Sequence, residues 1–534
     1  MLIVSGVSFR DSQTTFNNQA FFGGWNVLFN SFQFLIFFPI VLLGYYLIPK
    51  KIRHFWLLLA SYYFYMCWNA KYALLILLST VITYASGRLL EAIREKGVKS
   101  PADAPAASLP DGVTRRMKWV VAGSFLTNLG ILFFFKYANF FFSVLAQAFA
   151  AAHIALNMPQ FDVLLPVGIS FYTFQALSYT MDVYRGEIRA EKDFFRYALF
   201  VSFFPQLVAG PIERSKNLLS QLREPKPFTL QAAFDGILLM LWGYFLKIVV
   251  ADRLALFVDT IYADPINYGG TYLILATILF AAQIYCDFAG YSIIAMGAAE
   301  ILGIKLTENF NAPYFATSVA EFWRNWHISL TTWFRDYLYF PLGGSRRGTL
   351  RKYRNIMIVF LVSGLWHGAS FTYVLWGGIN GLYQVLGEIF KPVRKKVSSL
   401  LHLNPRSLGS RIVATLWTFF LIDVTFIFFR TGRLKETMTV IKQIVTVHNP
   451  GVLFTGELYD CGLDRRNFWF AIITVAIILS VDFCKHRGIT IRGVIARQDA
   501  WFKCVFVALA IVFLLTFGKY GPAYDAANFI YFQF

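Results

Sequence analysis

Long apolar runs recur along almost the whole of this chain, and they restrict its fold more than any other feature. An apolar helix of roughly 20 residues is long enough to cross the hydrocarbon core of a bilayer. The sequence predicts about 11 such spans, the second of which could form two shorter or re-entrant pieces. The predicted runs are 31–48, 54–90, 117–150, 163–182, 194–211, 231–258, 271–303, 355–390, 411–430, 468–484 and 500–518. We therefore expect an all-α polytopic membrane protein.

The composition excludes the main alternatives. Of 534 residues, 57% are hydrophobic and 15% are charged, which is more apolar surface than a soluble fold of this size can bury. The 49 Lys and Arg outnumber the 30 Asp and Glu, but they fall in short clusters between the apolar runs. This is the positive-inside pattern of a protein in a lipid bilayer, and it predicts no nucleic-acid partner.

The basic clusters also predict a topology. Lys50, Lys51 and Arg53 follow the first apolar run directly, which places that end in the cytoplasm and the N-terminus outside. The segment 258–270 and the residues after Lys519 contain no Lys or Arg, so both are expected outside. Four further basic segments are expected inside, at 91–118, 346–354, 394–396 and 485–497. Both termini are therefore predicted to be extracytoplasmic.

One membrane domain is the simplest organisation, because no fixed-period repeat is visible. We divide the chain into an extracytoplasmic or interfacial segment (1–30), a membrane domain (31–518) and an extracytoplasmic tail (519–534). The first segment lacks the basic start and apolar centre of a signal peptide. The five cysteines form no CxxC pair, so we expect neither a disulfide framework nor a metal site.

Polar side chains concentrate in the segment 321–383, beside stretches apolar enough to lie in a bilayer. Polar groups at that depth are costly and mark functional sites. If 321–338 forms one helix, Arg324, His327, Thr331 and Arg335 share an arc of about 80°. This stripe fits an interfacial helix with snorkelling arginines and tryptophan anchors. It equally fits arginines that hold the phosphates of a nucleotide-like donor.

His367 is the second polar group of interest. A helix starting at Asn355 would carry it about 18 Å into the membrane, near the midplane. It could be a structural histidine bonded to a neighbouring helix. It could also be a general base, since imidazole accepts a proton near neutral pH. The small residues Ser363, Gly364 and Gly368 would let a substrate or another backbone approach closely.

These residues carry a family resemblance. WRNWHISLTTWFRDYLYFPLGG and SGLWHGASFTYVLWGG resemble motifs of the membrane-bound O-acyltransferase (MBOAT) family, in its bacterial branch that acts on alginate and other polysaccharides. Supporting stretches are LPVGISFYTFQALSYTMDVYRG, FFPQLVAGPIER, GYFLKIVVADRLA and QIYCDFAGYSIIAMG. The resemblance covers most of the chain. It implies a ring of transmembrane helices around a thinned centre, where a cytoplasmic acyl-CoA tunnel meets an outward-facing funnel.

The resemblance also implies roles for individual residues. His367, in the WHG motif, would be catalytic, and His327, in the WHISL motif, would be its companion. Further candidates for the donor site or tunnel are Arg324, Arg335, Trp326, Trp366, Ser363 and Asp336.

The sequence ends in NFIYFQF, so that Phe529, Tyr531 and Phe534 form an F-x-Y-x-x-F pattern. Aromatic residues beside a membrane commonly anchor the chain at the interface. The pattern is also similar to a C-terminal tyrosine motif of polysaccharide-modifying export systems. That similarity implies that Tyr531 accepts the acyl group and passes it to an extracytoplasmic transferase.

Together with the apolar composition, the resemblance implies an O-acetyltransferase of the bacterial cell membrane. It would take acetyl from cytoplasmic acetyl-CoA, a substrate rather than a bound cofactor, and supply an extracytoplasmic SGNH-type or alginate-acetylation-type transferase that modifies a polysaccharide. Two alternatives stay open. One is a D-alanyl transferase for teichoic acid, which takes its acyl group from a carrier protein. The other is a lipid-linked sugar transporter without covalent chemistry.

Other polar residues carry less weight. Gln175, Tyr179 and Asp182 would share one helical face, and interhelical hydrogen bonds explain them more simply than a tunnel lining. The remaining histidines of interest are interpreted as surface residues, namely His54, His402, His448 and His486.

Overall fold

The computed structural model describes residues 27–97, 110–154, 158–162, 164–521 and 530. Within these residues all regular structure is helical and no strand occurs. The first half contains α2 (Phe32–Leu47), α3 (Arg53–Gly97), α4 (Asp111–Leu132), α5 (Ala138–Ala151), α6 (Ile169–Arg185), α7 (Phe194–Ser202), α8 (Phe204–Leu207), α9 (Ser215–Arg223), α10 (Leu230–Tyr244) and α11 (Asp252–Ala263).

The second half begins with the long helix α12 (Gly270–Ile301). It is followed by α13 (Val319–Asn325), α14 (Ile328–Phe334), α15 (Thr349–His367), α16 (Phe371–Ile389), α17 (Lys391–Leu400), α18 (Leu408–Thr431), α19 (Leu434–Thr446), α20 (Val452–Thr455), α21 (Arg465–His486), α22 (Ile491–Ala496) and α23 (Ala500–Phe517). Three π-helical segments interrupt these rods, at Phe133–Tyr137 (η4), Phe245–Ala251 (η5) and Arg335–Tyr339 (η7).

Seven helical stretches in the described part of the chain are long and apolar enough to cross a membrane. They are Lys50–Gly97, Asp111–Ala151, Leu230–Ala263, Gly270–Ile301, Leu408–Thr431, Arg465–His486 and Ala500–Phe517. Asn69 adopts extended backbone angles and breaks α3 into two pieces. Leu509, Val512 and Leu515 on α23 are each more than half exposed, as expected for a helix that faces lipid. The chain is a multi-pass membrane protein.

The predicted spans 163–182 and 194–211 differ from the structure. The first corresponds to α6, which has 17 residues and starts only at Ile169. The second is divided between α7, of nine residues, and α8, of four, because Phe203 leaves the helical conformation between them. Neither α7 nor α8 is long enough to cross a bilayer.

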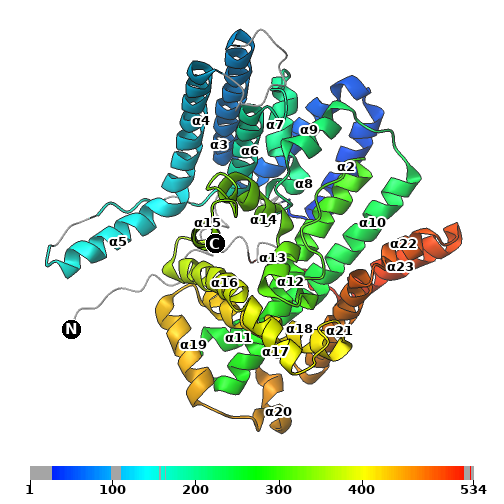
Figure 1. Cartoon of the computed structure of the whole chain (residues 1–534). Coiled ribbons are helices and arrows are strands. Elements are labelled where there is room, and N and C mark those ends of the chain that lie inside the picture. Colours follow the sequence, from blue (N-terminus) through cyan, green and yellow to red (C-terminus); the bar gives the residue numbers. More distant parts are fainter. Residues whose placement is uncertain (1–26, 98–109, 155–157, 163, 522–529, 531–534) are drawn as a thin grey trace.

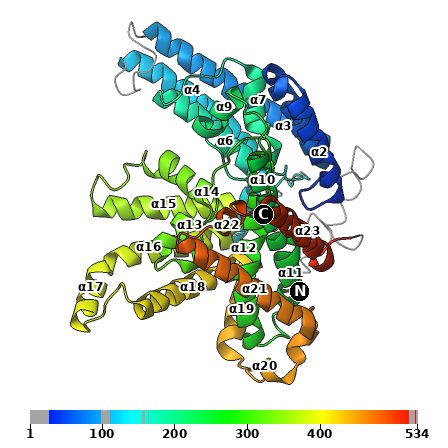
Figure 2. The same ribbon diagram turned by 90° about the vertical axis from the view of Figure 1, so that its right-hand side faces the viewer.

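The long helix α12 occupies the centre of the molecule (Figures 1 and 2). It packs antiparallel to the rod formed by α10, η5 and α11, and glycines set the separation of the two. A Cβ atom at Gly243 would lie 2.7 Å from the carbonyl oxygen of Gly290, and one at Gly236 would lie 2.6 Å from that of Gly297. Glycine at these four positions lets the two backbones approach closely, as in many membrane helix pairs.

The predicted single span 355–390 is wrong. The structure divides it into α15 and α16, an antiparallel hairpin that turns at Gly368–Ser370. The hydroxyl of Ser370 caps α16 by accepting a hydrogen bond from the backbone N–H of Thr372. A hairpin brings the basic segments 346–354 and 394–396 to the same end of the helix pair. Their shared positive charge is therefore compatible with one side of the membrane, which a single crossing would not allow.

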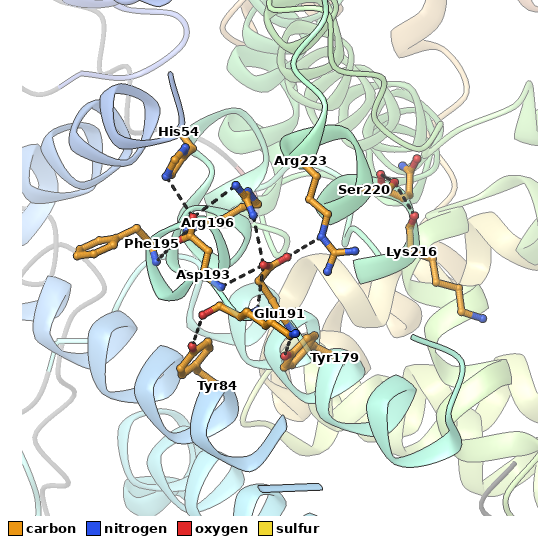
Figure 3. A network of polar contacts seen from close by, with 12 residues as sticks. His54, Tyr84, Tyr179, Glu191, Asp193, Phe195, Arg196, Lys216, Ser220 and Arg223 are labelled. Atoms are coloured by element: carbon orange, nitrogen blue, oxygen red, sulfur yellow. Dashed lines mark hydrogen bonds and ion pairs between the residues drawn. The ribbon is translucent and has the colours of Figure 1, made fainter. Parts of the chain in front are cut away.

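A polar network joins α3, α6, α7 and α9 (Figure 3). Glu191 lies at its centre and accepts hydrogen bonds from Arg223 Nε at 2.7 Å and Arg196 Nη1 at 3.3 Å. Its own backbone N–H donates to the hydroxyl of Tyr179. His54 is buried and lies 3.4 Å from the carboxylate of Asp193. The prediction that His54 is a surface residue is therefore wrong, whereas His402, His448 and His486 are exposed as predicted.

The polar face predicted on 175–182 forms interhelical hydrogen bonds, as expected. Gln175 Nε2 donates to the carbonyl of Phe200 at 2.5 Å. Asp182 accepts hydrogen bonds from the hydroxyls of Ser215 at 2.8 Å and Tyr337 at 2.5 Å. These contacts fix α6 against α7, α9 and η7.

Candidate active site

His327 lies between two short helices and adopts an unusual backbone conformation. It has φ 45° and ψ 54°, in the left-handed region, and it follows the end of α13 and precedes α14. Its side chain is 1% exposed. A non-glycine residue in this region carries strain that the surrounding structure must hold in place, and such residues cluster at functional sites.

Asn309 holds His327 in place. The backbone N–H of Ser329 donates to Asn309 Oδ1 at 3.3 Å and the Ser329 hydroxyl donates to the same oxygen at 2.9 Å. Because a backbone N–H can only donate, these bonds identify the atom that faces His327 as the amide oxygen. His327 Nδ1 lies 3.1 Å from it and must therefore donate. This tautomer leaves Nε2 as the acceptor nitrogen of the ring.

His367 is the last residue of α15 and is 4% exposed. Its ring packs edge to face against the rings of Trp366, Trp376 and Phe429, with centroid separations of 5.0, 5.0 and 5.5 Å. The helix starts at Thr349 rather than Asn355, so His367 lies about 27 Å from its beginning at 1.5 Å per residue. The depth of His367 in the membrane stays a prediction, because the first residues of α15 are basic and polar.

The two histidines meet although 40 residues separate them in the sequence. Their ring centroids are 6.5 Å apart. Aromatic residues from three elements surround the pair. The ring centroids of Phe171 on α6, Trp366 on α15 and Phe288 on α12 lie 6.2, 6.1 and 4.7 Å from that of His327. The structure thus brings together two buried imidazoles in an apolar enclosure.

A lysine stabilises the end of α15. Lys136 Nζ donates to the carbonyl oxygens of Trp366 at 2.6 Å and His367 at 3.3 Å, and the hydroxyl of Tyr137 donates to that of Leu365 at 2.9 Å. Both donors lie in the π-helix η4. The last carbonyls of a helix have no partner within it, and a basic side chain there also interacts favourably with the helix dipole.

Replacing Lys136 by methionine is expected to destabilise the protein by about 1–3 kcal/mol, because carbonyls beside His367 lose their donor in an apolar environment. The activity that the family resemblance implies should fall at the same time, since the position of His367 depends on this helix end. Thermal unfolding in detergent and that activity, measured with the purified protein, give the two effects. Lys118→Met, an exposed lysine on α4, is the matched control and should change neither. Wild-type stability of Lys136→Met would contradict the capping role.

The predicted polar stripe on 321–338 does not exist, because His327 breaks the helix between α13 and α14. Arg324 is exposed on α13 and does not share a face with the buried His327. Arg335 is also exposed, and its Nε donates to Asp336 Oδ1 at 2.9 Å. The stripe fails for a local reason, namely the left-handed backbone of a single residue.

Arg335 and Asp336 belong instead to a separate basic cluster. Asp336 Oδ2 accepts from Arg214 Nη2 at 3.2 Å, and its carbonyl accepts from Arg185 Nη2 at 2.8 Å. Both arginines stack on the ring of Tyr337, at 4.3 and 5.1 Å from its centroid. Three guanidinium groups therefore gather around Asp336, two at its carboxylate and one at its backbone carbonyl.

The other predicted residues divide between the site and the core. Trp366 lies beside both histidines, and Ser363 is buried one turn before His367 on α15. Trp326 is buried among aromatic residues of the core, with Phe310 and Phe322 at 5.1 and 5.3 Å. Tyr531 lies outside the described residues.

Two site residues escaped the sequence reasoning. Lys136 gives a usable signal, because it is a lone charge in the apolar stretch FFFKYANFFF. Asn309 gives none, since it lies in a loop and its function depends on a contact 18 residues away.

With this geometry in hand, the comparisons with known proteins assign the class. The chain belongs to the membrane-bound O-acyltransferase family, MBOAT, whose family model matches residues 187–431, a range that includes both histidines. It is an acyltransferase. It is similar to a protein of Pseudomonas putida named probable alginate O-acetylase AlgI, with 33% identity over 95% of this chain and 100% of that protein.

Two further relatives extend the comparison. The peptidoglycan O-acetyltransferase of Helicobacter pylori is 28% identical over 95% of this chain and 98% of its own. The teichoic acid D-alanyltransferase of Bacillus subtilis is 26% identical over 52% of this chain and 72% of its own.

Proposed function

We propose that this protein is an O-acetyltransferase that moves an acetyl group from cytoplasmic acetyl-CoA across the bacterial cell membrane for the O-acetylation of a cell-surface polysaccharide. Its relatives named for alginate and peptidoglycan support this class of acceptor. The observation that carries the proposal is the buried pair His327 and His367, with ring centroids 6.5 Å apart. In this proposal the membrane domain is a ring of transmembrane and re-entrant helices around a thinned centre, and it includes the seven stretches long enough to cross a bilayer.

The acceptor in this proposal is the hydroxyl of Tyr531. His367 takes the phenolic proton, and the oxygen attacks the thioester carbonyl of acetyl-CoA. The C–S bond then breaks, and the leaving thiolate takes up the proton from His367. The products are coenzyme A and an acetyl ester on Tyr531. A transferase of the SGNH type on the outer side then passes the acetyl group to a sugar hydroxyl.

His327 contributes as a positioned partner. Its Nδ1–H is held by Asn309, and its strained backbone fixes the direction of the ring. A histidine with one nitrogen bonded in this way presents the other in a fixed orientation to the reacting group. We assign it the orientation of the acceptor or the stabilisation of the developing oxyanion.

The basic cluster around Asp336 is the proposed contact for the phosphates of the donor. Guanidinium groups match phosphate geometry, and Arg185, Arg214 and Arg335 lie around Asp336, with the carboxylate of Glu187 3.8 Å from Arg185. We place the basic cluster on the cytoplasmic side of the membrane, because the basic segment 346–354 begins shortly after η7 and is expected in the cytoplasm. The exposed Arg324 lies on α13 rather than in η7 and is a weaker candidate.

Two other functions are less well supported. A D-alanyl transferase is disfavoured because the similarity to the relative of that name covers only 52% of this chain. A lipid-linked sugar transporter needs neither a general base nor a positioned second imidazole. The identity of the acyl donor distinguishes the D-alanyl transferase from the proposed function. Covalent labelling of the protein distinguishes the transporter from it.

Incubation of the purified protein with radiolabelled acetyl-CoA is expected to place the label on Tyr531. Tyr531→Phe should lose at least about 100-fold of this label, because the phenyl ring retains the shape of the side chain but has no nucleophilic oxygen. Mass spectrometry of the peptide that contains residue 531 checks the position. The matched control is Tyr520→Phe, which removes an exposed tyrosine hydroxyl.

Full labelling of Tyr531→Phe would contradict Tyr531 as the acceptor. Labelling only from a D-alanyl carrier protein would support the alternative donor. Transport of a lipid-linked sugar by His367→Ala with no label on wild-type protein would support the transporter.

A further inference from the structure

A buried ion cluster lies at the middle of α12 and has no part in the chemistry described so far. Lys247 Nζ lies 2.7 Å from Asp287 Oδ1 and 2.8 Å from Asp252 Oδ1. The Lys247 side chain is 1% exposed, that of Asp287 is 3% and that of Asp252 is 9%. Such a cluster costs several kcal/mol to desolvate and is weak evidence for a purely stabilising role. Charged groups at this depth in a membrane protein mark functional sites.

The second oxygen of Asp287 binds a distant part of the chain. Asp287 Oδ2 accepts a hydrogen bond from the backbone N–H of Ile530 at 2.8 Å. Ile530 is itself 7% exposed. The hydrogen bond is charge-assisted and lies in an apolar interior, which makes it strong. Residue 530 is therefore held inside the membrane domain by its backbone.

Ile530 follows the last long helix, α23, and yet it contacts the middle of α12. After α23, the N–H of Lys519 donates to the carbonyl of Ile248 on η5 at 2.8 Å. Asp287 lies about 25 Å from the Gly270 end of α12 and about 21 Å from its Ile301 end. The chain at Ile530 thus reaches the middle of the central helix.

The same helix forms a wall of the histidine site. Phe288, the neighbour of Asp287, has its ring 4.7 Å from that of His327. Ser292, one turn further on, accepts a hydrogen bond from Asn309 Nδ2 at 3.2 Å, and Asn309 holds His327. One stretch of α12 therefore contacts both Ile530 and the support of His327.

We infer that Asp287, fixed by Lys247, is a positioning residue that anchors the chain through the backbone of Ile530 and so delivers Tyr531 to the histidine pair. Consecutive Cα atoms are 3.8 Å apart, so an anchor at residue 530 limits the reach of residue 531. This inference rests on the proposed role of Tyr531 as acyl acceptor. Lys247 orients the carboxylate from 2.7 Å, and Asp287 acts through the chain that it holds rather than on the reacting atoms.

The sharpest test removes the backbone N–H that donates to Asp287 and leaves the ion cluster intact. Ile530→Pro has no N–H at residue 530, so the anchor is lost while Lys247, Asp252 and Asp287 are unchanged. Labelling of Tyr531 by acetyl-CoA is expected to fall about tenfold or more, the factor associated with a hydrogen bond to a charged group. The loss should appear in kcat with an unchanged KM for acetyl-CoA. Ile530→Val keeps the N–H and most of the side chain, so this variant should label Tyr531 as the wild type does.

Hydrogen exchange tests the anchor without any substrate. In the full-length protein the amide of Ile530 is expected to exchange at least about 100-fold more slowly than an unbonded amide. Asp287→Ala should abolish this protection, and thermal unfolding shows whether that variant is folded. Free exchange of amide 530 in the wild type, or equal labelling of Ile530→Pro and wild type, would overturn the anchor.

The outcomes separate the two proposals. Protection at amide 530 combined with full labelling of Tyr531→Phe leaves the anchor in place and refutes Tyr531 as acceptor. Labelled Tyr531 without protection at amide 530 supports the acceptor and refutes the anchor.

Discussion

His367→Ala is expected to lower the rate of acetyl transfer by about 10²- to 10⁴-fold, the usual contribution of a general base. The reason is that Tyr531 would have to be deprotonated without an acceptor inside an apolar enclosure. Single-turnover transfer from radiolabelled acetyl-CoA, measured with purified protein at matched expression, gives the rate. The fall should be in the chemical step rather than in binding of acetyl-CoA, because His367 lies at the histidine pair and not in the basic cluster around Asp336.

Two companion variants make this result interpretable. His448→Ala removes an exposed histidine and should leave transfer unchanged. His327→Ala, compared at the same expression, decides whether the second imidazole is essential, since a wild-type rate would remove it from the mechanism. Near wild-type transfer by a folded His367→Ala would eliminate His367 as the base.

The long helices were predictable because hydropathy alone sets their extent. The runs 271–303, 411–430 and 468–484 correspond to α12, α18 and α21 within a few residues at each end. Each contains an apolar run long enough to cross the apolar layer of a bilayer, so its presence is encoded locally. The fold class followed from this regularity.

The active-site hairpin was not predictable by the same means. The turn between α15 and α16 consists of Gly368, Ala369 and Ser370, which interrupt the helix without interrupting the apolar run. Hydropathy averaged over a window therefore predicts one span where the chain forms two antiparallel helices. Only the cap at Ser370 carries a local signal, and it is weak.

The histidine pair was predictable in identity but not in arrangement. Both residues stand out as polar groups in apolar surroundings. The break at His327, however, depends on Asn309, which binds the ring and the following residue from a separate loop. A helical projection of 321–338 cannot include that contact, so it placed Arg324 and His327 on one face.

Gly377→Ala is expected to destabilise the protein by about 1–3 kcal/mol and to reduce acetyl transfer about 100-fold. A Cβ atom at Gly377 would lie 2.2 Å from the carbonyl oxygen of Phe360 and 3.2 Å from Cα of Gly364. Both obstacles are backbone atoms of α15, so no side chain can move aside and the two helices must separate. His367 follows Gly364 by less than one turn, and its ring would shift relative to His327.

Gly387→Ala provides the matched control, because it makes the same change on the same helix where no atom lies within 4 Å of the added Cβ. Its unfolding temperature and transfer rate should equal or slightly exceed those of the wild type, since alanine favours the helix. Thermal unfolding in detergent and single-turnover transfer are measured for both variants. A wild-type unfolding temperature and rate for Gly377→Ala would mean that α15 and α16 do not meet at this crossing. The position of His367 would then have to come from Lys136 and the aromatic residues around it alone.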